Sequence, residues 1–127
     1  MAKSVIRTES APAPFGGAPY NQAIVANGFV FTAGQVGFMP DGTLVEGGIV
    51  AQTNRTFDNL AAILEAAGSS LADLVKTTVF LQDLADFGAM NEVYKERVPA
   101  PHPARSTFQV AKLPGGAAVE IEAVATV

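Results

Sequence analysis

The chain has 127 residues, of which 49% are hydrophobic and only 16% are charged, and its formal net charge is −4. It has no cysteine and one histidine, which argues against disulfides, thiolate catalysis and a metal cofactor, while the acidic balance argues against nucleic-acid binding. Because an ordinary soluble domain carries about 25% charged residues, one copy alone would expose unusual apolar area, and we expect self-association.

The length and the lack of a linker-like stretch predict one domain over residues 1–127. The longest apolar runs fall far short of the ~20 residues that cross a bilayer. Residues 1–9 have no apolar signal core. We therefore expect a cytoplasmic protein that does not bind membranes.

The first third of the chain predicts three short strands. A strand is expected over residues 4–8, followed by an irregular loop over 11–20 that is rich in proline and glycine. Two apolar runs follow at 23–26 and 29–33. Asn27-Gly28 between them is typical of a two-residue hairpin turn, because both central positions of that turn need a positive φ.

The middle of the chain predicts two helices with a strand between them. Apolar residues recur at spacings of three and four from 48 to 67, where Gly68 is expected to end the helix. Residues 75–81 are expected to form a central strand, buried on both faces. Helical spacing returns from 87 to 98 and ends at the prolines that begin with Pro99.

Two strands are expected at the end of the chain, over 105–110 and 119–127, with Glu120 and Glu122 on one face of the second. The Leu-Pro-Gly-Gly segment at 113–116 would by itself favour a hairpin between them. The order is thus β-β-β-α-β-α-β-β. Two helices cannot cover both faces of such a sheet, so we expect an α+β fold with a mixed β-sheet and both helices packed on one face.

Most catalytic motifs are absent. The sequence contains no GxGxxG, P-loop, HExxH or GxSxG pattern, so hydride, phosphoryl and metalloprotease chemistry lack their usual machinery. The one histidine, His102, lies between two prolines. We interpret it as an exposed loop residue rather than as part of a catalytic triad.

The most specific pattern lies near the end of the chain: Pro103-Ala104-Arg105-Ser106, then Leu113-Pro114, then Val119-Glu120-Ile121-Glu122-Ala123. It resembles the signature of the RidA/YjgF family, also called L-PSP. The resemblance extends over nearly the whole chain. Gly17-Ala18-Pro19-Tyr20 is similar to the family's Gly-Pro-Tyr, and Phe31 to Gln35 is similar to its Ser-Gly-Gln strand.

This resemblance implies a chorismate-mutase-like α+β fold in which the last strand enters the middle of the sheet. It also implies a homotrimer with three clefts between subunits. One histidine, no cysteine and no nucleotide-binding motif predict that the activity needs no metal or organic cofactor. The implied reaction is the hydrolysis of enamine and imine intermediates, of the 2-aminoacrylate and 2-iminopropanoate type, to 2-keto acids and ammonia. The implied enzyme is therefore a 2-iminobutanoate/2-iminopropanoate deaminase-like hydrolase.

By position in the motif, the resemblance implies that Arg105 binds the substrate carboxylate and that Glu120 positions the attacking water. A planar guanidinium can grip a carboxylate with two parallel hydrogen bonds, and a carboxylate can orient water and carry a proton. The residues implied to line the cleft and bind substrate, some of them from the adjacent subunit, are Tyr20, Gly34, Phe87, Asn91 and Thr107.

Each of these residues also has a structural explanation. Arg105 could belong to a surface ion pair, Glu120 could be solvated, and Tyr20 could pack beneath its loop. The chain also departs from the family in having Ala33 where members often carry serine and Thr107 where they often carry cysteine. A mechanism that needs a thiol is therefore disfavoured.

Two other functions stay open at this stage. The Arg105 cleft could hold 2-keto acids or related metabolites without catalysis, as a regulatory module. The family name also carries a ribonuclease activity, against which the acidic charge and the isolated histidine argue.

Overall fold

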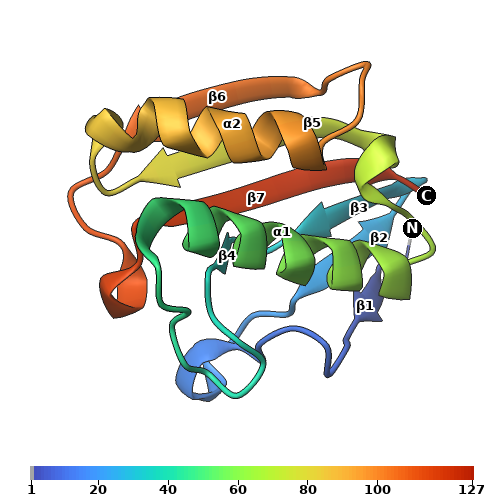
Figure 1. Cartoon of the computed structure of the whole chain (residues 1–127). Coiled ribbons are helices and arrows are strands. Elements are labelled where there is room, and N and C mark those ends of the chain that lie inside the picture. The colour runs from blue at the N-terminus through green and yellow to red at the C-terminus, as the bar shows by residue number, and fades with distance from the viewer. Residues whose placement is uncertain (1) are drawn as a thin grey trace.

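Seven strands form one sheet in the structure, a computed structural model that describes residues 2–127 (Figure 1). Along the main path they lie in the order β1-β2-β3-β7-β5-β6, and β4 also pairs with β7. Their bounds are Ser4–Ile6 for β1, Ala23–Ala26 for β2, Phe29–Thr32 for β3, Gln35–Val36 for β4, Leu74–Leu81 for β5, Ala104–Gln109 for β6 and Val119–Thr126 for β7.

The β2–β3 hairpin follows from local sequence. Asn27 and Gly28 at its turn have φ angles of 52° and 82°, the left-handed conformation that asparagine and glycine adopt most readily. Ala26 and Phe29 are paired directly across the turn. The hairpin predicted from Asn27-Gly28 is thus confirmed.

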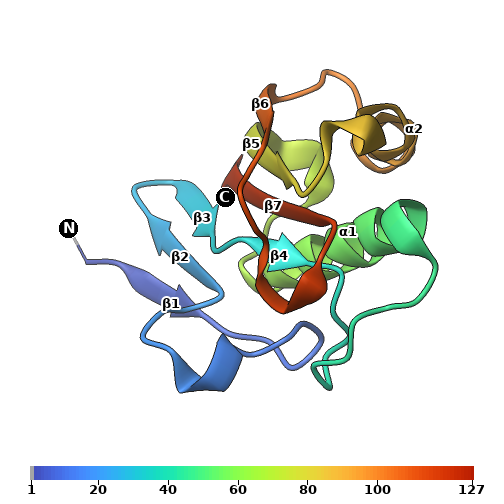
Figure 2. The ribbon, with the colours of Figure 1, turned by 90° about the vertical axis from the view of Figure 1, so that its left-hand side faces the viewer.

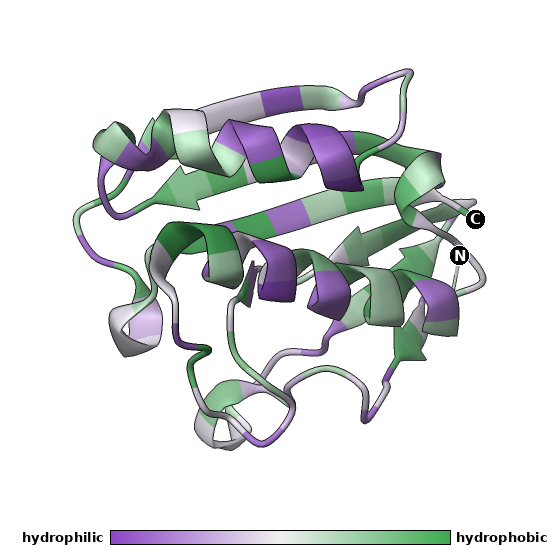
Figure 3. Ribbon diagram, viewed as in Figure 1, coloured by the Kyte–Doolittle hydropathy of each residue, from purple (hydrophilic) through white to green (hydrophobic). Residues whose placement is uncertain are grey.

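Helices α1 (Gly48–Ala66) and α2 (Phe87–Arg97) both lie on one side of the sheet, as Figure 2 shows from the end. Helix α1 ends as predicted, because Gly68 takes a φ of 82° and its N–H bonds to the carbonyl of Glu65. In Figure 3 hydrophobic residues predominate along the central strands, and hydrophilic residues are interspersed along both helices. This arrangement confirms the expected α+β fold with one covered face.

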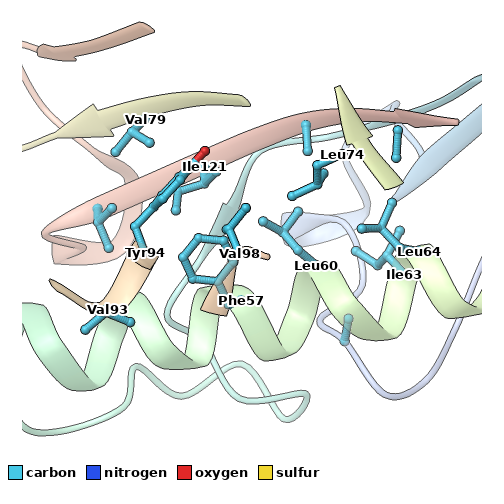
Figure 4. Packing of buried hydrophobic residues seen from close by; sticks show 14 of the residues in the cluster. Phe57, Leu60, Ile63, Leu64, Leu74, Val79, Val93, Tyr94, Val98 and Ile121 are labelled. Carbon is cyan, nitrogen blue, oxygen red and sulfur yellow. The ribbon is translucent and has the colours of Figure 1, made fainter. Parts of the chain in front are cut away.

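The core lies between the helices and the covered face (Figure 4). Helix α1 contributes a stripe at spacings of three and four, which is the pattern that the sequence showed. The labelled side chains that meet there are Phe57, Leu60, Ile63 and Leu64 from α1, Val93, Tyr94 and Val98 from α2 and its end, and Leu74, Val79 and Ile121 from the sheet.

The last strand occupies the middle of the sheet. Strand β7 pairs antiparallel with both β3 and β5, whereas β6 pairs parallel with β5 at the edge. A short 3-10 turn over Pro114–Gly116 therefore carries the chain from the edge strand to the centre, rather than closing a hairpin. The placement that the family resemblance implied is confirmed, and the hairpin that the local pattern favoured is not formed. Strand β4, only two residues long, was not predicted.

The other side of the sheet is not covered by a helix (Figure 2). We call this side the open face. It presents apolar side chains that are exposed to different degrees: Val5, Phe29, Phe31, Phe80, Phe108 and Val124. Within residues 2–127, no helix has the length and hydrophobicity needed to cross a membrane.

Candidate active site

Arg105 lies on β6, directly opposite Thr77 of β5. Its side chain points to the side of the sheet that carries α2. There its guanidinium carbon is 4.7 Å from the ring centre of Tyr94 and 5.6 Å from that of Phe87. Among the described residues, no hydrogen bond or ion pair engages this guanidinium. All of its N–H donors are therefore free to bind a ligand.

A pocket of about 370 Å³ opens beside this guanidinium. Its walls come from α2, from the loop that follows α2, and from the start of β6. The lining residues are Asn91, Glu92, Tyr94, Lys95, His102, Pro103 and Arg105.

Two buried polar atoms near Arg105 lack partners. They are the side-chain oxygens Oδ1 of Asn91 and Oγ1 of Thr107, neither of which has a hydrogen bond within the described chain. Thr107 follows Arg105 by two positions on β6 and so shares its face of the sheet. A buried polar group without a partner costs about 1–3 kcal/mol, and Asn91 lines the same pocket as the free guanidinium, which favours a site for a polar ligand there.

Glu120 lies on β7 and points to the open face. The register pairs it with Phe80, which pairs in turn with Phe108, so these three side chains share one side of the sheet. Arg105 belongs to the alternate set, which faces the helices. A single chain therefore keeps Arg105 and Glu120 apart, on opposite faces and separated by β5.

The environment of Glu120 disfavours its charged form. The side chain is half-buried, and this burial raises the pKa of its carboxyl, with a further contribution from the negative charge of Glu122. Gly34, between β3 and β4, lies against the same carboxylate, and any side chain placed at that position would collide with it. The Glu120 carboxylate can therefore keep this position only while residue 34 has no side chain.

Tyr20 and Gly34 line a second, smaller hollow together with Phe15. The hydroxyl oxygen of Tyr20 accepts a hydrogen bond of 2.9 Å from the backbone N–H of Phe15, which fixes the side chain although it is 39% exposed. The predicted site residues thus fall into two groups. We call Phe87, Asn91, Arg105 and Thr107 the arginine half-site, and Tyr20, Gly34 and Glu120 the glutamate half-site.

Sequence reasoning missed Tyr94. It lies three residues after Asn91 and seven after Phe87, on the same side of α2, and its ring is closer to Arg105 than the ring of Phe87. That spacing was the available signal, but it is also the spacing of a core residue.

His102 is exposed at the edge of the pocket, and no hydrogen bond joins it to a serine or a carboxylate within the described residues. No group of three or more potential metal-ligating side chains occurs in residues 2–127.

Comparisons with known proteins agree on one family. Residues 8–127 match the sequence profile of the family described as endoribonuclease L-PSP. The chain is 48% identical to Reactive Intermediate Deaminase A, chloroplastic, of Arabidopsis thaliana, an alignment covering 99% of this chain and 67% of that protein. It is 47% identical to the mouse 2-iminobutanoate/2-iminopropanoate deaminase, covering 98% of this chain and 92% of that protein. Among solved structures, Escherichia coli TdcF with bound serine superposes with a TM-score of 0.89 at 38% identity, and 98% of each chain is covered.

Proposed function

This chain belongs to the endoribonuclease L-PSP family, also called RidA/YjgF, and on that basis we propose that it hydrolyses reactive enamine and imine acids to 2-keto acids and ammonia. Two proteins that are 47–48% identical to it carry deaminase names of this kind. The proposed substrates are small acids of the 2-aminoacrylate and 2-iminopropanoate type, and the proposed products are their 2-keto acids.

The free guanidinium of Arg105 is the observation that carries this proposal. A 2-imino acid has a carboxylate next to its reactive carbon, and the two parallel hydrogen bonds of an arginine would hold that carboxylate in one orientation. The unpartnered oxygens of Asn91 and Thr107 then lie within the same half-site to meet the polar atoms of the substrate. Binding the carboxylate in this way fixes where the imine carbon lies.

Glu120 supplies the proton transfers in the proposed reaction. Its carboxylate takes a proton from water while the water oxygen bonds to the carbon of the protonated imine, and the C=N electron pair moves to nitrogen. Glu120 then returns that proton to the amine of the resulting carbinolamine. As the C–N bond breaks and ammonia leaves, the C=O bond forms and Glu120 accepts the hydroxyl proton, which it releases to solvent. A carboxyl with a raised pKa suits these transfers, and such assistance is worth ~10²- to 10⁴-fold.

The two half-sites must come from different subunits for this chemistry to occur. Arg105 and Glu120 of one chain face opposite sides of the sheet, so the arginine half-site of one copy would meet the glutamate half-site of the next. A homotrimer arranged in this way has three equal clefts and buries the apolar open face, where Phe31 and Phe108 are each 45% exposed. A cytoplasmic location remains a prediction from the sequence.

The test is the rate at which freshly generated 2-aminoacrylate releases ammonia and pyruvate, compared with buffer and with heat-denatured protein. We expect a clear acceleration by the native protein. A rate equal to that of buffer, together with saturable binding of pyruvate, would instead identify a non-catalytic binding module. Cleavage of RNA without any deamination would favour the ribonuclease activity that the family name carries.

A further inference from the structure

We propose that Tyr94 is a positioning residue for Arg105, which holds the guanidinium on its ring face so that every N–H donor stays free for the substrate. This inference rests on the proposed function of the arginine half-site. Tyr94 does not need to touch the substrate itself, because its effect passes through Arg105.

Tyr94 is close enough to hold the guanidinium. The 4.7 Å between the guanidinium carbon and the ring centre is well within the ~6 Å over which a cation is attracted to an aromatic face. Phe87 contacts the guanidinium as well, but at 5.6 Å and with 41% of its side chain exposed, so it contributes less. Tyr94 is only 6% exposed, and the attraction strengthens where water is excluded.

The ring of Tyr94 is itself held by two contacts, one at its hydroxyl and one at its ring. Its hydroxyl forms a 2.6 Å hydrogen bond with Oγ1 of Thr77, a fully buried residue. Thr77 is the residue that faces Arg105 across the β5–β6 pair, so the ring is tied to the strand that carries Arg105's neighbour. Phe57 packs edge-on against the ring, with the two ring centres 5.5 Å apart at 77°. This geometry leaves the ring little freedom to turn away.

An aromatic support suits an arginine that must bind a carboxylate. A glutamate or aspartate partner would also hold the guanidinium, but it would occupy the same N–H donors and compete with the substrate. Glu92 lines the same pocket, yet no ion pair joins it to Arg105 among the described residues. An aromatic face attracts the cation through the flat side of the guanidinium and consumes no donor.

The test replaces Tyr94 and measures ligand binding and turnover separately. Tyr94→Leu should raise the Kd for pyruvate and the KM for 2-aminoacrylate about tenfold, which is about 1.4 kcal/mol, and should change kcat less. Tyr94→Phe keeps the ring and should stay within about threefold of the parent. Ile63→Ala is the matched control, because it truncates a fully buried side chain of the same cluster that lies apart from Tyr94 (Figure 4). It should lower the Tm without changing either constant.

Two further measurements separate positioning from a general loss of structure. Stepwise fluorination of phenylalanine at position 94 weakens the ring's attraction for cations with little change of shape, and the Kd for pyruvate should rise with each added fluorine. The Nε–H NMR signal of Arg105, assigned by its loss in Arg105→Lys, should show a ring-current shift that Tyr94→Phe keeps and Tyr94→Leu removes. The NMR measurement and the fluorination series remain informative if the leucine variant does not fold.

The proposal is overturned if Tyr94→Leu binds pyruvate like the parent, if Ile63→Ala loses as much affinity, or if fluorination has no effect. A parent protein that neither binds pyruvate nor hydrolyses 2-aminoacrylate would overturn the proposed function instead. In that case the NMR shift of Arg105 alone decides whether Tyr94 positions it, since its absence in the parent overturns the proposal too.

Discussion

The position that a Cβ atom would take on Gly34 lies 2.8 Å from Cδ and 2.9 Å from Oε2 of Glu120. Real Cβ atoms essentially never approach another heavy atom so closely. The backbone of Gly34 and the carboxylate of Glu120 are therefore packed so closely that no side chain fits between them. A side chain at residue 34 would therefore force the Glu120 carboxylate to move, so the position of the carboxylate depends on the glycine.

Gly34→Ala should displace the Glu120 carboxylate, since it is the end of a flexible side chain and can move. We expect a fall in kcat of tenfold or more, with pyruvate affinity changed less because Arg105 lies in the other half-site. Gly88→Ala is the matched control. Gly88 is exposed on α2 with open space around it, so an added methyl should leave activity unchanged and raise stability by up to ~1 kcal/mol. Equal kinetics for the two variants would contradict the assignment of Glu120.

Arg105→Lys keeps the positive charge but loses the planar pair of donors. The loss of charged hydrogen bonds should cost about 1.5–3 kcal/mol, which is a 10- to 150-fold rise in the Kd for pyruvate by calorimetric titration. Deaminase activity should fall with it. A variant that binds and turns over like the parent would place the active site elsewhere.

Glu120→Gln is nearly isosteric, so the cleft should survive the change. We expect the variant to bind pyruvate about as tightly as the parent and to hydrolyse 2-aminoacrylate ~10²-fold or more slowly, because glutamine cannot carry the proton. Parallel calorimetry and stopped assays measure the two quantities. Full activity in this variant would show that another group activates the water.

The pH dependence of the reaction should reveal the pKa of Glu120. The carboxyl must be ionised to accept a proton from water, so kcat should decline as the pH falls through a pKa above the usual 4.5 of glutamate. Glu122→Gln removes the neighbouring charge and should move this acid limb to lower pH. If the acid side of the kcat–pH profile does not move, then burial alone raises the pKa of Glu120, or a different group titrates.

The raised pKa of Glu120 also affects how the free energy of unfolding depends on pH. Because the folded-state pKa of Glu120 is raised, its contribution to the free energy of unfolding is fully present below the ordinary glutamate value and is lost as the pH rises through the raised one. Glu120→Gln should therefore not destabilise the chain at neutral pH. This separates its catalytic effect from any effect on folding.

Light scattering should report a mass of about three times 13.1 kDa for the parent protein. Phe31→Glu places a charge on the open face and should yield monomers without deaminase activity, because neither half-site is complete alone. Val50→Glu is the control, since Val50 is 49% exposed on α1 rather than on the open face, and it should stay trimeric and active. An active monomer would contradict the shared site.

Local signals in the sequence were sufficient for most elements of this fold. The Asn27-Gly28 turn needed only its backbone preference, and α1 needed only its apolar spacing. The place of β7 could not be derived in this way. Leu-Pro-Gly-Gly before it is compatible with either a hairpin or a crossover, and the choice depends on which strand edges remain unpaired elsewhere. Strand β4 is too short for any periodicity to predict it.

The sequence proposes candidate site residues but does not give their arrangement in space. The motif singled out Arg105 and Glu120, yet only the register of β5, β6 and β7 reveals that they face opposite sides. The sequence could not show that Tyr94 is more than a core residue. A ring that packs against Phe57 and a ring that supports Arg105 require the same residue type at the same helical spacing.

The central position of β7 also has a consequence for biosynthesis. A ribosome makes β1 to β3 first and β5 and β6 later, but the strand that joins these two parts of the sheet is made after all the other strands of that sheet. Until residues 119–126 emerge, the edges of β3 and β5 that β7 will occupy have no partner, and such edges can pair with other nascent chains. Completion of the sheet is therefore delayed until residues 119–126 have emerged, and the strand that finally closes it is the one that carries Glu120.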